Sequence, residues 1–173
     1  TIYCLGYWGN KQTGGLFYKH FDRAKSTDGK IAYNPDIALH LTFDFNVNPY
    51  MSASLWQVVG KVAYCIDEFA MVSPDNNTAA VCKEFTRRYL SHNAGLFIYG
   101  DPSGRNEDTR SEKGHNDYTV IRKDLIQFNP VSRVDNLHPP VVTRGNFINN
   151  IFQDGFEGVN IIISEKCKHF IND

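Results

Sequence analysis

The strongest constraint on the fold is a run of three β-rich segments joined by short connections. Residues 38–47, ALHLTFDFNV, alternate in polarity and are rich in strand-forming side chains, which predicts a strand that carries Asp44. Residues 52–71, SASLWQVVGKVAYCIDEFAM, predict two further strands joined by a two-residue turn at Gly60-Lys61. The sequence therefore predicts an antiparallel meander of three strands.

Helices and strands alternate after the meander. The predicted helices cover residues 73–92, 117–128, 145–156 and 165–173, and the predicted strands cover 95–100, 139–144 and 159–164. Asp117 is expected to cap the second of these helices, and Phe147 is expected to face inward from the third together with Ile148, Ile151 and Phe152. This order predicts an α/β fold of the ribonuclease H-like type, in which parallel strands extend the meander into a mixed sheet flanked by helices.

Composition narrows the class of protein. A chain of 173 residues is of single-domain size, and its 18 basic and 19 acidic residues create no global field that attracts nucleic acid, although a local basic face would suffice. The four cysteines lie far apart without zinc-ligand spacing, which favours a reducing compartment. No apolar run approaches the roughly 18 residues of a membrane span, so no membrane partner is expected.

Two acids stand at positions where chemistry is plausible. Asp44 lies between two phenylalanines in a strand predicted to be central, where a carboxylate either faces solvent or binds a metal. Asp101 follows the apolar strand 95–100 and either makes an Asx-type turn into Pro102 or faces a ligand at the strand tip. In the predicted order these two strands are neighbours, so both carboxylates could hold Mg²⁺ or Mn²⁺. A pair of such ions can activate water and stabilise the leaving oxygen in phosphodiester cleavage.

Other polar residues give weaker signals. Glu68 ends the third strand beside Asp67 and is a further candidate ligand, as is Asp117 if it does not serve only as a helix cap. Several cations fall in or near the loop that Asp101 opens and could contact phosphates; those singled out are Arg105, Arg110, Lys113 and Arg144. The sequence contains no Gly-x-x-x-x-Gly-Lys-Ser/Thr loop, so this chain is not expected to hydrolyse nucleotides by itself.

Five stretches together resemble a known family. LTFDFNVNPYMSASLWQ, YCIDEF, GLFIYGDPSGR, DYTVI and VVTRGNFINNIF are similar to the C-terminal nuclease domain of the large terminase subunit of tailed bacteriophages and prophages. The resemblance covers about residues 39–173, and the acids of the first and fourth strands are its most specific matches. GYWGNKQTGG is loosely similar to the segment that joins this domain to an ATPase domain, so residues 1–38 are interpreted as a lead-in from that domain.

The resemblance implies a metal-dependent endonuclease that cuts concatemeric viral DNA during genome packaging in the cytoplasm of a bacterial host. Asp44 matches the first metal-binding acid of the family, and Asp101 matches the second. The implied cofactors are two Mg²⁺ or Mn²⁺ ions. The implied partners are double-stranded DNA, the ATPase domain of the same polypeptide, the portal and the small terminase subunit.

The third acid of the family follows the last strand, and HFIND at residues 169–173 resembles the stretch that precedes it. The third ligand is therefore expected beyond Asp173, or it is replaced by Asp117 or Glu68.

Two alternatives to the endonuclease function stay open at this point. One is a ribonuclease H-like domain that binds DNA or a packaging partner without a complete metal site, and the other is a transposase or junction resolvase, which shares the fold and the carboxylates.

Overall fold

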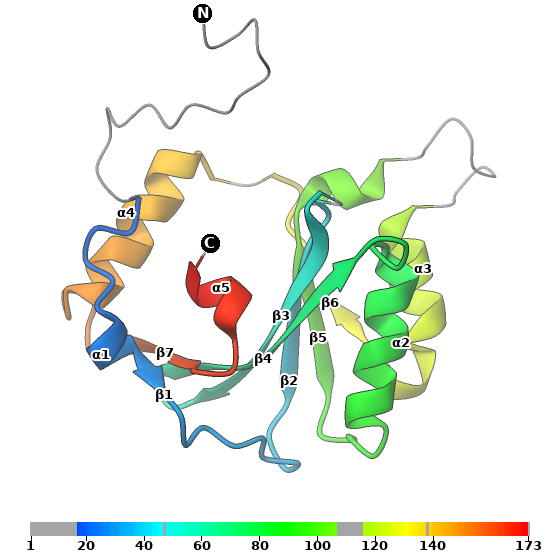
Figure 1. Ribbon diagram of the computed structural model, residues 1–173, viewed down its shortest axis with the longest axis horizontal. Helices are drawn as coiled ribbons and strands as arrows, with labels where there is room; N and C mark the ends of the chain where they lie inside the picture. Colours follow the sequence, from blue (N-terminus) through cyan, green and yellow to red (C-terminus); the bar gives the residue numbers. More distant parts are fainter. Residues whose placement is uncertain (1–16, 47, 107–115, 138, 173) are drawn as a thin grey trace, which may run out of the picture.

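The centre of the molecule is a mixed sheet of seven strands in the order β1-β7-β4-β3-β2-β5-β6 (Figure 1). The computed structural model describes residues 17–46, 48–106, 116–137 and 139–172. The strands are β1 (Thr27–Asp28), β2 (Leu39–Asp44), β3 (Tyr50–Val59), β4 (Val62–Val72), β5 (Leu96–Gly100), β6 (Val131–Ser132) and β7 (Asn160–Ser164).

Helices cover both faces of the sheet. The α-helices are α1 (Arg23–Ser26), α2 (Thr78–Tyr89), α3 (Asp117–Asp124), α4 (Val141–Phe152) and α5 (Lys168–Asn172), and two 3₁₀ helices are η2 (Pro102–Arg105) and η3 (Ile126–Phe128). Figure 1 shows α2 and α3 on one side of the sheet, with α1, α4 and α5 on the other. On that second side, α1 and α4 contact β7 and α5 contacts β4, so these helices lie over one half of the sheet.

The predicted meander is confirmed. Strands β2 and β3 pair antiparallel, as do β3 and β4, and Gly60 provides the positive φ of 59° that the tight turn between β3 and β4 requires. Strand β5 then pairs parallel to β2, and β7 pairs parallel to β4. The mixed, ribonuclease H-like sheet is therefore confirmed, with the meander in the middle and parallel strands on both sides.

The main hydrophobic core lies between the sheet and the α2–α3 side. Asn77 caps α2 by accepting a hydrogen bond from the Ala80 amide at 2.9 Å, and α2 then buries Val81, Cys82 and Phe85 at helical spacing. These side chains pack on fully or almost fully buried residues of four strands, β2 to β5: Leu39, Leu41, Phe43, Met51, Leu55, Phe69, Leu96 and Ile98. The helix predicted within 73–92 is thus confirmed, but it covers only Thr78–Tyr89 and starts after the Asn77 cap.

A buried carboxylate ties this core to the helices. Asp67 on β4 pairs with Leu55, directly beside the point where the register of β3 and β4 shifts, between Leu55 and Trp56. Its exposed fraction is 7 %. The Asp67 carboxylate accepts hydrogen bonds from Arg88 at 3.1 Å and from Tyr89 at 2.7 Å. Lys166 lies 3.6 Å away, before α5. Asp67 is therefore a paired structural acid, as a buried charge must be.

The prediction of a strand over residues 139–144 is wrong, because Val141–Phe152 is one continuous helix. Pro140 occupies the position before the first helical residue, where its fixed φ and missing N–H cost nothing. Val141 and Val142, which suggested a strand, are 56 % and 69 % exposed. Phe147 was also misplaced: it is 47 % exposed and packs edge-on against Phe156 instead of facing inward.

The helix α4 is held by residues whose role the sequence did not reveal. A Cβ at Gly145 would lie 2.5 Å from the Phe17 ring, so the glycine permits close approach of the chain near Phe17. The Asn149 side chain accepts from the His20 amide at 3.3 Å and donates to the Phe17 carbonyl at 2.8 Å. These contacts bind the segment that begins at Phe17 to α4.

Two short strands were missed. Strand β1 lies in the segment expected to be an irregular lead-in and pairs with β7, and β6 pairs with β5 at the opposite edge of the sheet. Each has only two residues, too few to show any alternation in sequence.

Among the described residues, no helix is long and apolar enough to cross a membrane.

Candidate active site

Asp44 and Asp101 stand at the ends of adjacent parallel strands. The last registered pair of β2 and β5 is Phe43 with Gly100, and the next residues along the two strands are Asp44 and Asp101. Neighbouring strands lie about 5 Å apart, so the two acids leave the sheet from adjacent positions at one edge. The predicted juxtaposition of their strands is therefore confirmed.

The direction of the Asp44 side chain follows from its neighbours. Phe43 is 2 % exposed in the core, and Phe45 stacks on it with ring centroids 5.8 Å apart. Because side chains alternate along a strand, Asp44 points to the opposite face of the sheet, where it is exposed. One of its oxygens accepts a hydrogen bond from the Asn46 amide at 3.2 Å.

The chain around Asp101 is closely packed. A Cβ at Gly100 would lie 2.7 Å from Tyr118 Oη and 3.0 Å from the Phe43 carbonyl oxygen, so only glycine fits before Asp101. The Tyr118 hydroxyl donates to the Asp101 carbonyl at 2.7 Å, and burial raises the pKa of this phenol. The Asp101 carboxylate accepts from the Ser103 amide at 2.8 Å and so caps η2.

The Asx-type turn expected from Asp-Pro-Ser-Gly is thus present. The Phe45 ring packs against this turn at Gly104, so closely that a Cβ there would clash with the ring. The residues of GDPSG therefore fix the position of the Asp101 backbone relative to β2.

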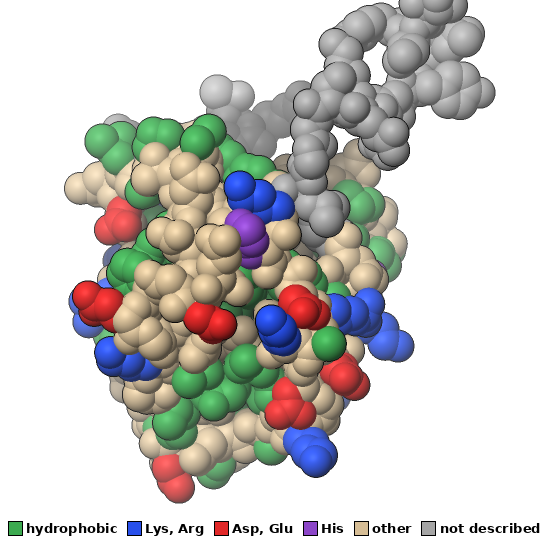
Figure 2. All heavy atoms as spheres, turned by 90° about the vertical axis from the view of Figure 1, so that its left-hand side faces the viewer, with side chains coloured by type: hydrophobic (Ala, Val, Ile, Leu, Met, Phe, Trp, Pro, Cys, Tyr) green, Lys and Arg blue, Asp and Glu red, His purple; other side chains and the backbone are tan. Residues whose placement is uncertain are grey.

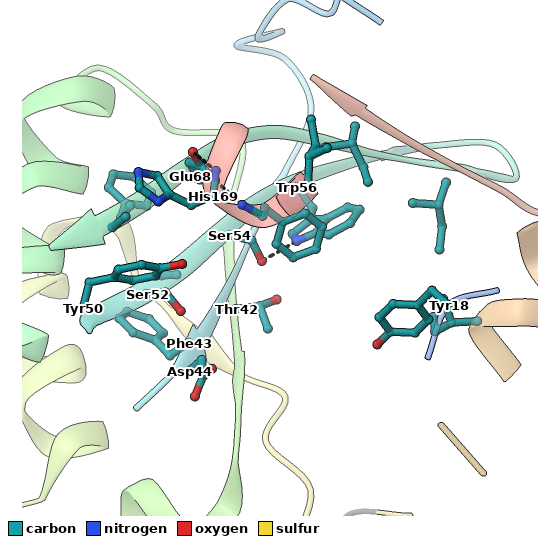
Figure 3. Close-up of a pocket in the computed structure, with 18 of the residues that line it drawn as sticks. Tyr18, Thr42, Phe43, Asp44, Tyr50, Ser52, Ser54, Trp56, Glu68 and His169 are labelled. Carbon is teal, nitrogen blue, oxygen red and sulfur yellow. Dashed lines mark hydrogen bonds between the residues drawn. The ribbon is translucent and has the colours of Figure 1, made fainter. Parts of the chain in front are cut away.

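Asp44 lies at the border of a cavity of about 490 Å³ on the face of the sheet opposite α2 and α3 (Figure 3). Its floor carries the hydroxyl side chains of β2 and β3, namely Thr42, Ser52 and Ser54. Its walls are largely aromatic and come from β3, α4, α5 and the segment before α1; they include Tyr50, Trp56, Tyr18, Phe152 and Phe170. Ser54 accepts a hydrogen bond from the Trp56 indole N–H at 2.8 Å.

Glu68 lines the same cavity but serves α5. Its two carboxylate oxygens accept hydrogen bonds from the amides of His169 at 3.0 Å and Phe170 at 2.7 Å (Figure 3). In the sheet, Glu68 pairs with Ser54 and Asp44 pairs with Ser52, so the two acids lie on different rows and two strands apart. Glu68 therefore fixes α5 over the cavity, away from the edge that carries Asp44.

Asp117 lies in the layer of α2 and α3. Asn116, and not Asp117, caps α3, and its side chain accepts from the Thr119 amide at 3.0 Å. The Asp117 carboxylate accepts a hydrogen bond from the Thr78 hydroxyl at the start of α2. The expectation that Asp117 caps α3 is therefore wrong by one residue, and its carboxylate joins the two helices.

Of the four cations proposed to contact DNA, the two that the structure describes lie on different elements, η2 and α4. Arg105 donates to the carbonyls of Val134 at 2.7 Å and Asp135 at 2.9 Å, which binds η2 to the segment after β6. Arg144 is exposed on α4, at the β7 side of the sheet, and Arg110 and Lys113 lie outside the described residues. Basic and acidic side chains are interspersed on the α4 side of the molecule (Figure 2).

The donor set at the strand ends suits a hard cation only in part. Asp44 and Asp101 offer the carboxylate oxygens that Mg²⁺ and Mn²⁺ prefer. Within residues 17–46, 48–106, 116–137 and 139–172, no three His, Cys, Asp or Glu side chains gather in a metal-binding group. The described residues thus offer two candidate carboxylates for such a site, and water or a further ligand would have to complete the coordination.

The chain is similar to known proteins in structure and not in sequence. No family model matches the sequence, and no curated protein matches it. The large terminase of a thermophilic bacteriophage matches the structure with a TM-score of 0.61 in one crystal form and 0.59 in another, at 13 % identity. The nuclease domain of the P22 large terminase matches with a TM-score of 0.61 at 11 % identity.

The chain has the fold of a large terminase nuclease domain. Each match covers 91 % of this chain, together with 76 % of the P22 nuclease domain. The chain spans only about a third of the thermophilic phage terminase, at 36 % of its length. The recognition of this fold from its sequence motifs is therefore confirmed, at an identity that carries no information on individual residues.

The sequence interpretation missed the residues that build the cavity. Thr42, Ser52 and Ser54 alternate with buried apolar residues along β2 and β3, and this alternation was visible in LTFDF and SASLW. Tyr50 and Trp56 continue the same alternation along β3. His169 gave no such signal, because its place in the cavity depends on the position of α5 over the sheet.

Proposed function

We propose that this chain is the nuclease domain of a phage or prophage large terminase and cleaves DNA phosphodiester bonds with the help of divalent metal ions. The observation that carries the proposal is the registered end of β2 and β5, which brings Asp44 and Asp101 to one edge of a terminase nuclease fold. The acids also lie where open α/β sheets bind ligands, beyond the carboxyl ends of parallel strands.

In this proposal Asp44 and Asp101 hold one or two Mg²⁺ or Mn²⁺ ions, which supply Lewis acidity for attack by water and for departure of the 3′ oxygen. The chain's own part is positioning. The Tyr118 hydroxyl and the close contact at Gly100 fix the Asp101 backbone, while Phe43 and Phe45 direct Asp44 to the exposed face. The binding of two carboxylates to cations also lowers their repulsion for an incoming phosphate.

The biological setting follows the same proposal. The substrate is concatemeric double-stranded viral DNA in the cytoplasm of a bacterial host, and residues 1–38 lead in from an ATPase domain of the same polypeptide. The portal and the small terminase subunit are the expected partners. The near-neutral charge of −1 is consistent with weak DNA binding by this domain alone.

The test uses nicking of supercoiled plasmid in the presence of Mn²⁺ or Mg²⁺. Asp44→Asn and Asp101→Asn each keep the size of the side chain and remove its charge, so each should reduce nicking by about a hundredfold or more while the circular dichroism spectrum stays unchanged. The matched control is Asp36→Asn, an exposed acid before the start of β2 and so at the opposite end of this strand from Asp44, which should nick like the wild type. Undiminished nicking by either site variant, or nicking that survives chelation of divalent ions, would refute the proposal.

A second candidate function is a DNA-binding or packaging module with an incomplete metal site. Two observations favour it: Glu68 is engaged with the amides of α5, and no cluster of three ligands occurs among the described residues. Calorimetric titration with Mn²⁺ separates the two. The nuclease requires metal binding that is lost in Asp44→Asn, whereas the module predicts DNA binding without measurable metal binding.

A further inference from the structure

We propose that the cavity beside Asp44 receives one unpaired DNA base, from the nucleotide next to the phosphodiester bond that is cut. This inference rests on the proposed nuclease function for the position of the phosphate, while the base-binding property belongs to the cavity itself. A cavity of about 490 Å³ is within the size range of small-molecule sites and too small for a base pair with its stacked neighbours. A base therefore reaches it only when it leaves the duplex stack.

The walls of the cavity are suited to a planar aromatic ligand. Trp56 and Tyr50 stand on β3, and α5 holds each of them edge-on: Phe170 contacts Trp56 with centroids 5.5 Å apart, and His169 contacts Tyr50 at 5.1 Å. Their positions on either side of the hydroxyl floor are visible in Figure 3. Every nucleobase has a π-face that stacks on such side chains without a requirement for sequence.

The floor of the cavity indicates that the ligand has a polar edge. Among the described residues, neither the Thr42 nor the Ser52 hydroxyl has a hydrogen-bond partner. An apolar occupant, such as a leucine-rich helix of another protein, would bury both hydroxyls without partners, which is unfavourable. A base offers amino, imino and carbonyl groups along its edge that can pair with them.

The charges of the cavity favour a neutral base over a phosphate inside it. No Lys or Arg is among the described residues that line it, and its two acids are Asp44 and Glu68. Asp44 lies beside Ser52 in the register of β2 and β3, at the border of the cavity. A nucleotide whose phosphate lies near Asp44 would thus direct its base past Ser52 towards Trp56.

The role of Glu68 fits this arrangement. By accepting the amides of His169 and Phe170, its carboxylate holds α5 in the position from which these two residues support the aromatic walls. Glu68 is thus a positioning residue for the base site.

The experiment measures binding without cleavage, in a chelator, with the full chain and oligonucleotides that contain one fluorescent adenine analogue. Three probes are compared: a single strand, a perfectly paired duplex and a duplex with the analogue unpaired in a bulge. The unpaired probes should bind about tenfold more tightly than the paired duplex, with quenched emission because the analogue stacks on an aromatic ring.

Trp56→Ala should weaken binding of the bulged probe by about tenfold and restore its emission, and Thr42→Val should weaken it by about threefold. Phe147→Ala removes an exposed aromatic ring on α4 outside the cavity and is the matched control. Because Trp56→Ala could disturb packing around α5, the near-isosteric Thr42→Val variant and the wild-type quenching each test the site independently.

Equal affinity for paired and unpaired probes, or quenching that persists in Trp56→Ala, would overturn the inference. Loss of binding in Phe147→Ala would indicate instead that α4 is the DNA-contacting surface. If Asp44→Asn nicks plasmid normally while the bulged probe still binds, the nuclease proposal fails and the base site stands. If nicking depends on Asp44 but the probes are not distinguished, only the base site fails.

Discussion

Alternate residues along β2 and β3 point to opposite faces of the sheet, and these two faces differ in chemistry. Towards α2 and α3 these strands present Leu39, Leu41, Phe43, Met51, Ala53 and Leu55, each no more than 4 % exposed. Towards α5 they present His40, Thr42, Asp44, Ser52, Ser54 and Trp56. A sheet face that only supported helices would be apolar on this second side as well.

The apolar face and the polar face of this sheet therefore have different roles. The apolar face packs without a need for hydrogen bonds and supplies most of the stability, because burial of hydrocarbon is the main favourable contribution to folding. The polar face keeps a cavity that packing alone would close, and unfilled volume costs stability. We infer that this cost is retained because the polar face binds the substrate.

The largest effect should come from the apolar face. Phe85 is fully buried in α2 and contacts the rings of Phe69, Tyr89 and Phe128 at centroid distances of 6.2, 5.4 and 5.2 Å. Phe85→Ala should lower the free energy of unfolding by about 3–5 kcal/mol, because it removes a buried ring and leaves a void. Urea denaturation followed by circular dichroism measures this change.

The matched variant on the polar face is Thr42→Val, which should change the free energy of unfolding by less than about 1 kcal/mol. Similar losses for Phe85→Ala and Thr42→Val would show that both faces carry stability alike, and the separation of tasks would be wrong.

A smaller effect is expected where the two faces meet, at the tip of β5. Tyr118→Phe removes the hydroxyl that donates to the Asp101 carbonyl, which should cost about 1 kcal/mol of stability. Because that bond fixes the backbone of a proposed metal ligand, the rate of Mn²⁺-dependent nicking should fall by about tenfold. Denaturation and plasmid nicking measure the two quantities on the same preparation.

The control is Tyr89→Phe, which loses a hydrogen bond to the buried Asp67 carboxylate, in the core between the sheet and α2. It should be destabilised at least as much, because bonds to charged groups contribute more, and it should nick at the wild-type rate. A parallel loss of nicking in both tyrosine variants would mean that the effect of Tyr118 is general destabilisation and not positioning of Asp101.

Whether a structural feature could be predicted from the sequence depends on how far apart in the sequence the interacting residues lie. The meander and α2 were predictable because alternation, helical spacing and the Gly60 turn act over a few residues. The pairing of β2 with β5 is not local, and it was predictable from the order of strands and helices. Val141 and Val142 misled, because their strand propensity is weak against a proline start and a helix face that buries Gly145 and Ile151.

The same distinction applies to the site. The tips that carry Asp44 and Asp101 were predictable, since strand order alone brings them together. The engagement of Glu68 could not be predicted, because its partners, the amides of His169 and Phe170, lie about a hundred residues further along the chain. Contacts of that range are set by the packing of α5 and leave no pattern in the local sequence.

The smallest effect is expected at the outer surface of α2, on the side of the sheet away from the cavity. Hydrogen bonds from Arg87 and, to a lesser extent, Arg88 lower the pKa of Glu84 to about 2, against some opposing desolvation. Since the pKa in the folded state lies below the unfolded value of 4.5, the contribution of Glu84 is complete above about pH 4.5 and is lost as the pH falls towards 2. Glu84→Gln should therefore cost only about 0.5 kcal/mol at neutral pH, because solvent screens these pairs, and less near pH 3. Urea denaturation at both pH values measures it, and a deficit that grows on acidification would contradict the assigned direction.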